Sequence, residues 1–439
     1  MKILFLSRPL AALALALLAV NARAYDIYSD GIYYNVLSEK DRTVEVTSPG
    51  KGYYYRGSRS IPSKVINNGI TYTVTSIGDR AFDGCDALTS VTFPATLTSI
   101  GDNAFQGCSA LTSVDLSTIS LTSIGDYAFQ NCDALTSVDL SSTSLTSIGY
   151  ATFYNCDALT SVAFPASLTS IGGSAFYYCY ALTSVAFPTS LTSIGYYAFS
   201  GCGALSVDLS STSLTSIGDK AFFGCSALTS VAFPASLTSI GYYAFKDCDA
   251  LTNLTVDEGN PAFASRDNVL YSKSLDTLVC YPTGANKEVV IPDMVCSVRE
   301  GAFPGEVSTV YCQPQTPPTA VDGEFQDMFS SDELMNAVLY VPVGTKAAYM
   351  KVDPWRNFWN VEEMDFATVG IDGVAAQGVP SVTVRGGAIV VEGAAATDVV
   401  EVFAADGRCA YRGASATISH LPGGIYVVRV GKHVQKVAL

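Results

Sequence analysis

The stretch SIGDRAFDGCDALTSVTFPATLT, from Ser76 to Thr98, is one period of a repeat that dominates this chain of 439 residues. Its opening tripeptide Ser-Ile-Gly recurs at intervals of 23 or 24 residues, with the isoleucine at Ile77, Ile100, Ile124, Ile148, Ile171, Ile194, Ile217 and Ile240. Phenylalanine, cysteine and leucine follow at fixed offsets, as Phe82, Cys85 and Leu88 do in the first copy. Such a period predicts a solenoid, in which each coil buries its apolar face against the next.

Two spacings within the period predict its local structure. Two apolar positions that lie two residues apart, such as Val91 and Phe93, indicate a short β-strand. The spacing of three in Gly-x-x-Ala-Phe-x-x-Cys-x-x-Leu favours one turn of α or 3₁₀ helix. We therefore expect an α/β repeat solenoid, mostly β with short helical turns, whose parallel coils stack about 4.8 Å apart.

The repeat also resembles a known class. The segment Leu135–Leu140 reads Leu-x-x-Val-x-Leu, which is similar to the leucine-rich repeat signature. The period, the Ile-Gly-x-x-Ala-Phe-x-x-Cys core and the Phe-Pro or Leu-Ser strand exit resemble the BspA-like class of leucine-rich repeats. This resemblance implies a cell-surface protein that adheres to host matrix proteins or to other cells. A glycan-binding surface protein in nutrient capture is the alternative.

The resemblance extends to the flanks of the eight repeats in residues 76–256. Residues 25–75 contain motifs similar to the family's lead-in, which are Asp30–Tyr34, Ile61–Pro62 and Tyr72–Val74. Residues 257–365 contain motifs similar to a degenerate coil and a closing module, which are Val269–Tyr271, Ile291–Pro292, Gly301–Phe303, Leu339–Pro342, Trp355 and Phe358. We expect both flanks to cap the exposed strand edges of the solenoid.

Residues 1–24 have the pattern of a secretory signal. Lys2 and Arg8 precede the apolar run Leu10–Val20, and the A-x-A site that follows predicts cleavage between Ala24 and Tyr25. The run is shorter than the roughly 20 residues of a bilayer span, although a membrane anchor is the alternative. No later stretch is apolar enough to span a membrane, so we expect the mature chain to have no transmembrane segment.

Residues 366–439 form a segment of different composition. Alternating runs such as Val382–Val384, Ile389–Val391 and Val399–Phe403 predict strands, and we expect a small all-β sandwich. The segment resembles the C-terminal sorting domain of type IX secretion cargo through Gly407, Arg408, Pro422, Gly424, Tyr426 and Lys436. That resemblance implies recognition by the type IX machinery, and display on or release from the outer membrane of a Gram-negative bacterium. An ordinary terminal sandwich with a ligand of its own is the alternative.

Charge and histidine content exclude several classes of function. The net charge is −15, and removal of Lys2, Arg8 and Arg23 with the signal leaves −18, which disfavours nucleic acid and anionic membranes. The only histidines are His420 and His433, so a Ser-His-Asp triad, a Cys-His pair or a His-ligated metal is excluded from nearly all of the chain. We expect no enzyme activity and no cofactor. Paired carboxylates near the C-terminal cap are the one enzymatic alternative, with the candidates Asp327, Glu333, Glu362 and Glu363.

Eight of the twelve cysteines occupy one column of the solenoid. Parallel neighbours in such a column meet the distance of a disulfide but not its usual dihedral angle, so we expect buried free thiols. The pairing state of the other four stays open, namely Cys280, Cys296, Cys312 and Cys409.

Two faces of the solenoid could bind a ligand. The strand face carries small hydroxyl side chains together with Asp115 and Asp139, a solvated surface with at most weak affinity for cations. Tyrosines gather on the other face, between the glycine and the cysteine of successive coils. They are Tyr127, Tyr150, Tyr154, Tyr177, Tyr178, Tyr180, Tyr196, Tyr197, Tyr242 and Tyr243. Tyrosine is enriched at protein interfaces and its ring also stacks on sugars, so these residues are our candidate ligand site. Surface decoration without a ligand is the alternative.

Overall fold

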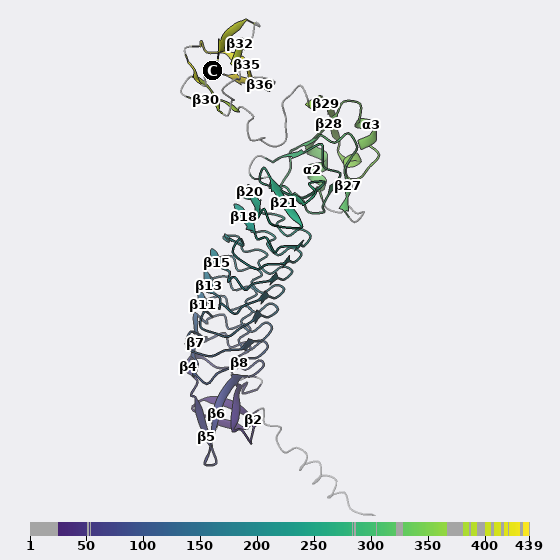
Figure 1. The fold of residues 1–439 in the computed structure, drawn as a ribbon. Coiled ribbons are helices and arrows are strands. Elements are labelled where there is room, and N and C mark those ends of the chain that lie inside the picture. Colours follow the sequence, from purple (N-terminus) through teal and green to yellow (C-terminus); the bar gives the residue numbers. More distant parts are fainter. Residues whose placement is uncertain are drawn as a thin grey trace, which may run out of the picture. The chain divides into compact units, whose positions relative to one another are not determined.

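The computed structural model describes most of the chain between Tyr25 and Ala438. The described ranges are 25–50, 52, 54–282, 284, 287–303, 305–321, 328–366, 381–385, 388–392, 400–404, 408–413, 417–419, 421–430 and 433–438. The chain divides into two units, whose strands and helices are labelled in Figure 1. Unit 1 consists of Met1–Leu228 and Ser239–Phe245, and unit 2 of Thr229–Thr238 and Lys246–Leu439.

Unit 1 begins with a sheet that changes from antiparallel to parallel pairing. Its strands are β1 (Ile27–Ser29), β2 (Ile32–Ser38), β3 (Thr43–Thr47), β5 (Lys64–Asn67), β6 (Ile70–Ile77), β8 (Ser99–Ile100) and β10 (Ser123–Ile124). Strands β1 to β3 pair antiparallel, whereas β3 pairs parallel with β6, which in turn pairs parallel with β8. Ile77 lies opposite Ile100, so β6 connects the N-terminal sheet to the first repeat in register.

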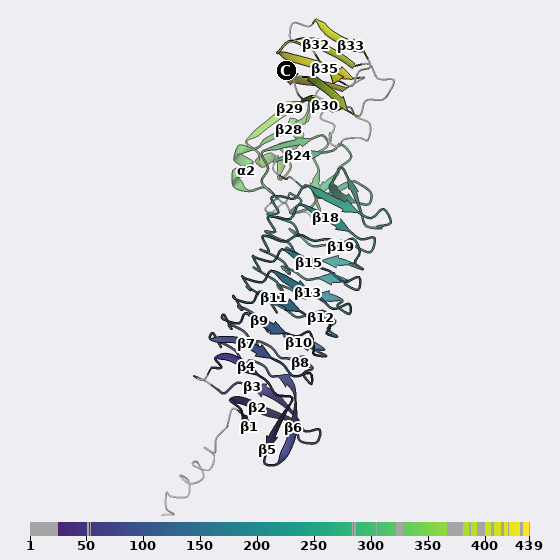
Figure 2. The same ribbon diagram turned by 90° about the vertical axis from the view of Figure 1, so that its left-hand side faces the viewer.

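The strand predicted in each coil is present in every repeat except the one that contains Val207, and successive copies form a parallel ladder (Figure 2). This ladder consists of β4 (Gly57–Ser60), β7 (Leu88–Thr92), β9 (Ser113–Asp115), β11 (Ser137–Asp139), β13 (Ser161–Ala163) and β15 (Ser184–Ala186). Equivalent residues pair, as Val91 does with Val114. The central valine is buried while the residues on either side are largely exposed, because alternate side chains of a strand point to opposite faces.

The next coil interrupts this ladder. Its sequence is one residue shorter between Leu205 and Val207 than the preceding coil is between Leu182 and Val185. The pairing is reduced to a single bridge from Ser184 to Ser206, and Val207 is only half-buried.

A second parallel ladder runs through the Ser-Ile pairs, which the sequence did not predict to be strands. Strands β8 and β10 end the N-terminal sheet at these positions, and a separate five-stranded parallel sheet takes over with β12 (Ser147–Ile148), β14 (Ser170–Ile171), β16 (Ser193–Ile194), β17 (Ser216–Ile217) and β19 (Ser239–Ile240). Each strand has only two residues, which is too short for an alternating pattern to be recognised.

The prediction of a helical turn between the glycine and the leucine of each coil is wrong. In the first coil the N–H groups of Asp83 and Cys85 donate to carbonyls three residues earlier, but those of Phe82 and Gly84 donate to the following coil. Arg80 has φ 55° and Gly84 has φ 69°, in the left-handed region that ends a right-handed helix. The segment is therefore a series of separate turns whose remaining N–H groups bind the neighbouring coil.

The interior of unit 1 is built from columns of identical side chains. The rings of Phe82 and Phe105 stack with centroids 4.8 Å apart, and the column continues in near-parallel stacks as far as Phe222 and Phe245, 5.6 Å apart. Beside it, the Cys108 thiol donates to the Phe82 carbonyl at 3.2 Å, and five later cysteines repeat this bond. All twelve cysteines of the chain are free thiols, and Cys296 and Cys409 are the two exposed ones. The prediction of a buried, unpaired thiol column is confirmed.

Between Ser230 and Met364, unit 2 contains three further sheets, in which β21, β22 and β23 pair antiparallel and the other neighbours pair parallel. The strands are β18 (Ser230–Phe233) with β20 (Asn253–Val256); β21 (Phe263–Arg266), β22 (Val269–Ser272), β23 (Thr277–Cys280), β25 (Ser297–Val298) and β27 (Thr319–Ala320); and β24 (Glu288–Ile291), β26 (Thr309–Cys312), β28 (Val338–Pro342) and β29 (Asn360–Met364). Among the described residues, short helices accompany them, namely α2 (Ser331–Asn336), α3 (Lys346–Tyr349) and η3 (Trp355–Asn357).

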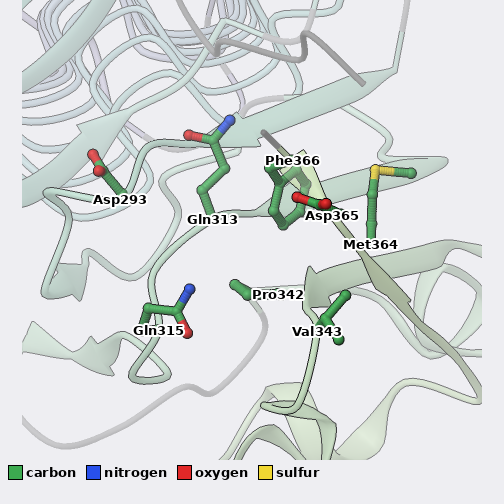
Figure 3. Close-up of a pocket in the computed structure, with 8 residues that line it drawn as sticks. All are labelled: Asp293, Gln313, Gln315, Pro342, Val343, Met364, Asp365 and Phe366. Atoms are coloured by element: carbon green, nitrogen blue, oxygen red, sulfur yellow. The ribbon is translucent and has the colours of Figure 1, made fainter. Parts of the chain in front are cut away.

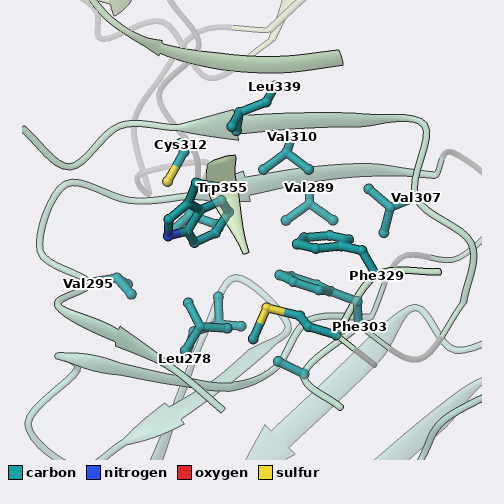
Figure 4. Close-up of a cluster of buried hydrophobic side chains, with 14 of the residues drawn as sticks. Leu278, Val289, Val295, Phe303, Val307, Val310, Cys312, Phe329, Leu339 and Trp355 are labelled. Carbon is teal, nitrogen blue, oxygen red and sulfur yellow. The ribbon is translucent and has the colours of Figure 1, made fainter. Parts of the chain in front are cut away.

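Its core uses large, non-repeating side chains (Figure 4). Trp355 is fully buried beside Phe329, and its Nε1 donates to the Pro318 carbonyl at 2.8 Å. The hydroxyl of buried Tyr349 donates to the Pro314 carbonyl at 2.6 Å. Each ring thus satisfies its polar atom, which burial of tryptophan or tyrosine requires.

The secondary structure described for the C-terminal segment from Ser381 onward is all β, as the sequence predicts. Two antiparallel sheets are formed, one by β30 (Ser381–Arg385), β31 (Ala388–Glu392) and β34 (Thr417–Ile418), the other by β32 (Val400–Ala404), β33 (Cys409–Gly413), β35 (Ile425–Val430) and β36 (His433–Ala438). Val391 of one sheet and Val402 and Val428 of the other belong to one buried apolar cluster. No helix among the described residues is long and apolar enough to cross a membrane.

Candidate functional site

Eight of the candidate tyrosines form one continuous group of rings on the turn segments of unit 1, which we call the tyrosine patch. Its members are Tyr127, Tyr150, Tyr154, Tyr177, Tyr178, Tyr180, Tyr196 and Tyr197. Tyr196 is 50% exposed, Tyr180 is 51% exposed and Tyr178 is 37% exposed, and the other five are half-buried. The patch therefore offers solvent a large aromatic surface.

One part of the patch follows the position after Ser-Ile-Gly. The ring centroids of Tyr127 and Tyr150 lie 5.1 Å apart, and those of Tyr150 and Tyr196 lie 6.0 Å apart. The latter contact skips the coil between them, which carries Gly173 at this position. A Cβ on Gly173 would lie 2.6 Å from the Tyr196 ring, so glycine makes room for the ring.

The other part follows the phenylalanine column. Tyr177 contacts Tyr154 at 5.0 Å, Tyr178 at 4.1 Å and Tyr197 at 5.8 Å between ring centroids, so it joins the two parts. Tyr178 is stacked on Tyr180 at 5.3 Å. The contacts of Tyr177 with Tyr154 and Tyr197 link residues of different coils, and therefore depend on the stacking of the solenoid.

Tyr242 and Tyr243 lie further along the repeat, and Lys220 connects Tyr243 to the patch. The Lys220 ammonium lies 5.3 Å from the centroid of the Tyr197 ring, 5.4 Å from that of Tyr243 and 5.9 Å from that of Phe223. A cation over an aromatic face is attracted by the negative potential of that face. Sequence reasoning did not predict this lysine, because its distance to the rings depends on neighbouring coils.

Aspartates occupy the same position as Tyr150 and Tyr196 in other coils. Asp102 Oδ1 accepts the N–H of Asp126 at 2.8 Å, and Asp126 Oδ1 accepts that of Tyr150 at 2.7 Å. Each carboxylate thus satisfies a backbone donor of the next coil. Tyr150 follows the last aspartate of this run, so the acidic column borders the tyrosine patch.

The aspartates of the strand face have a structural role. Asp115 Oδ1 accepts from the N–H and the hydroxyl of Ser117, and Asp139 Oδ1 accepts the N–H of Ser141 at 2.9 Å. The hydrogen bonds from the serines lower the pKa of both carboxyls. Across the described part of the chain, no group of three or more histidine, cysteine, aspartate or glutamate side chains could hold a metal ion.

The carboxylates of the enzymatic alternative are not brought together. Glu333 is buried and accepts the N–H groups of Val307 and Ser330, both at 2.6 Å, as part of a capping box for α2. Glu363 accepts the N–H of Lys346 at 3.0 Å. Glu362 is exposed on β29, and Asp327 lies outside the described residues. Glu333 and Glu363 therefore bind backbone N–H groups, and no described pair of this set faces one another.

A cavity of about 390 Å³ in unit 2 was not predicted (Figure 3). It is lined by Asp293, Gln313, Gln315, Pro342, Val343, Met364, Asp365 and Phe366. These residues come from four separate stretches of chain, so no spacing in the sequence brings them together. The lining mixes carboxylates, amides and apolar groups, and Figure 3 shows the Asp293 and Asp365 carboxylates apart from one another.

The described members of the sorting-tail motif are Arg408, Pro422, Gly424, Tyr426 and Lys436. The Tyr426 hydroxyl donates to the Pro422 carbonyl at 2.8 Å, which holds the chain at the start of β35. Gly407 and Ala24 lie outside the described residues, whereas Tyr25 is described.

The comparisons with known proteins agree with the repeat architecture. Residues 53–182 and 146–275 match the family described as BspA type leucine rich repeat region, in six copies. A leucine rich cell surface protein from Faecalibacterium prausnitzii is 25% identical, with a TM-score of 0.50 over 77% of this chain and 94% of that one. The leucine-rich repeat protein of T. pallidum is 26% identical, with a TM-score of 0.37 over 52% and 90% of the two chains. A leucine-rich repeat protein from Bacteroides ovatus is 20% identical, with a TM-score of 0.39 over 78% and 100%.

Among curated proteins, none matches. The family match covers residues 53–275, which is half of the chain. This range contains most of the coils, interior columns and strand ladders described above. The chain belongs to the BspA-type leucine-rich repeat family.

Proposed function

We propose that this protein is exported to the bacterial surface, where it binds protein partners through the tyrosine patch and so mediates adhesion to host matrix proteins or to other cells. The observation that carries this proposal is the continuity of eight tyrosine rings over neighbouring coils of a rigid stack. Large aromatic side chains that stay exposed are typical of the centre of protein interfaces.

The rigidity of the patch supports a binding role. Gly173 lies under the ring of Tyr196, and Gly201 lies under the ring of Tyr178, with the added Cβ only 2.2 Å from that ring. Rings that are already held in place lose little conformational freedom when a partner binds. The patch is therefore suited to a partner with a complementary fixed surface.

Surface location is proposed from the sequence and the family. BspA-like repeat proteins are typically cell-surface proteins, and the similar F. prausnitzii chain is described as one. The signal pattern of residues 1–24 and the sorting-like tail of residues 366–439 support export across both membranes of a Gram-negative cell. A tail-deleted variant is expected to accumulate in the periplasm, and normal surface display without the tail would contradict the sorting role.

Adhesion tests the proposal directly. The full chain and a Tyr177→Ser/Tyr178→Ser/Tyr196→Ser/Tyr197→Ser variant are compared on immobilised fibronectin, fibrinogen and whole bacteria, and in parallel on a glycan array. We expect the wild-type chain to adhere to protein or cells and the variant to lose most of that binding. Equal adhesion by both chains would exclude the tyrosine patch as the binding surface. Binding to glycans alone would favour nutrient capture instead.

A matched control separates loss of contact from loss of fold. Tyr28 is 59% exposed and lies on β1, outside the patch. Tyr28→Ser is expected to leave adhesion unchanged. Circular dichroism should give the same thermal unfolding for wild type, the patch variant and Tyr28→Ser.

A further inference from the structure

We infer that the partner segment held by the tyrosine patch is an extended basic one, rich in arginine or lysine. This inference rests on the proposed function and adds the chemistry of the ligand. It follows from the charge of the chain around the patch, from the carboxylates beside the rings and from the position of Lys220.

The patch lies in a part of the chain that has no positive side chain. No lysine, arginine or histidine occurs from Ala81 to Asp219, and the same stretch carries ten aspartates. All eight patch tyrosines belong to it. Carboxylates without nearby bases produce a negative potential that attracts cationic ligands and repels acidic ones.

Several of these carboxylates lie beside the rings. Asp126 is exposed next to Tyr127 and accepts the N–H of Tyr150. Asp133 belongs to the same coil as Tyr127, and partial desolvation together with the like charge of Asp157 in the next coil raises the pKa of Asp133. Like charges that act on one another in this way would be relieved by a bound cation. The rim of the patch is therefore acidic as well as aromatic.

The chain itself shows how a cation binds these rings. Lys220 is the first basic residue after the base-free stretch, and its ammonium lies over Tyr197, Tyr243 and Phe223 at 5.3 to 5.9 Å. The other patch tyrosines present the same aromatic chemistry to solvent. An arginine or lysine of a partner would bind Tyr177, Tyr178 or Tyr196 as Lys220 binds Tyr197.

The dimensions favour an extended segment over a single small cation. Five coil steps separate the coil of Tyr127 from that of Tyr243, which at about 4.8 Å a step is roughly 24 Å. An extended chain rises about 3.3 Å per residue, so seven or eight residues would span this distance. Several basic side chains of one segment can then engage rings and carboxylates in successive coils.

The test uses the full chain and a defined probe. The probe is a ten-residue fluorescent peptide of alternating arginine and serine, and two matched peptides replace arginine with glutamine or glutamate. Fluorescence anisotropy is expected to show binding of the arginine peptide at least tenfold tighter than that of the glutamine peptide, and no binding of the glutamate peptide. Affinity for the arginine peptide should fall as NaCl rises from 50 to 500 mM, because salt screens the carboxylates.

Two kinds of variant test the rings and the charges separately. The double variant Tyr178→Ser/Tyr196→Ser is expected to lower the affinity for the arginine peptide at least fivefold, whereas Tyr28→Ser should leave that affinity unchanged. The double variant Asp126→Asn/Asp157→Asn should lower this affinity severalfold, because it removes two negative charges. Asparagine at position 126 still accepts the Tyr150 N–H, so the backbone contact is kept. Asp208→Asn changes the net charge on the strand side of a coil and should have little effect.

Three results would overturn the inference. These are equal affinity for the arginine and glutamine peptides, equal weakening by patch and control variants, and capture of glycan with no binding of any peptide. If the patch variants lose adhesion to intact proteins while the arginine peptide does not bind, the basic-segment inference fails and the proposed function stands. If the patch variants adhere normally, the proposed function fails as well.

Discussion

Two positions within each coil, the interior phenylalanine and the residue after Ser-Ile-Gly, differ sharply. The interior position is phenylalanine in every copy from Phe82 to Phe245, and the ring is fully or almost fully buried each time. The outer position is aspartate in four copies, tyrosine in three and glycine in one. Only the interior side chain must match an identical neighbour in the next coil, so stacking constrains the residue type at one position and leaves the other free to vary.

We expect the largest effect on stability from a substitution at the interior phenylalanine position. Phe176→Ala removes a fully buried ring between Phe153 and Phe199 and should lower the free energy of unfolding by about 3–5 kcal/mol. Tyr178→Ser, two residues away but exposed, should change it by no more than about 0.5 kcal/mol. Urea unfolding followed by circular dichroism measures both. Similar losses for the two variants would mean that the patch is part of the core.

The cysteine column gives the next prediction. In the native protein a thiol reagent should modify only the exposed Cys296 and Cys409, and after denaturation without a reductant it should modify all twelve cysteines. Burial excludes the reagent and disfavours the thiolate, raising for example the pKa of Cys85 to about 11. Fewer than twelve reactive thiols in denatured, unreduced protein would reveal a disulfide.

Glycines under the patch leave room for its exposed rings, so a substitution there tests both stability and the position of a ring. Gly201 has φ +77°, and a Cβ there would lie 2.2 Å from the Tyr178 ring. Gly201→Ala should destabilise the protein by about 1 kcal/mol and also displace Tyr178, which weakens binding at the patch. Gly203→Ala is the matched control, since its nearest neighbour would be the Ser226 hydroxyl at 3.6 Å. Thermal unfolding and peptide affinity should separate the two variants.

The strand-face carboxylates should have the smallest effect. Hydrogen bonds from Ser141 lower the pKa of Asp139 in the folded protein. The ionised Asp139 therefore adds to the free energy of unfolding at pH values above its unfolded-state pKa. That contribution is lost as the pH falls through the folded-state pKa. For a side chain this exposed we expect no more than about 0.5 kcal/mol. Melting temperatures of wild type and Asp139→Asn between pH 7 and pH 3 should converge at the acidic end. A constant difference would contradict this assignment.

The repeat sequence was sufficient for the strand at Val91 and its equivalents, for the buried columns and for free thiols in the cysteine column. Each of these depends on a local pattern that recurs at a fixed offset, and identical offsets stack on one another in any parallel solenoid. The helical turn was predicted wrongly because a spacing of three does not reveal that Arg80 and Gly84 are left-handed. Nor does it reveal that alternate N–H groups bind the next coil.

The candidate site, too, was predicted only in part from the sequence. The sequence by itself determined that tyrosines gather between glycine and cysteine, and that no base accompanies them from Ala81 to Asp219. Only the tertiary structure decided that Tyr150 reaches Tyr196 across an intervening coil, that Tyr177 joins the two parts of the patch, and that Lys220 lies over Tyr197. Composition and period are properties of the chain, whereas these contacts join residues 20 to 46 positions apart and exist only once the coils have stacked.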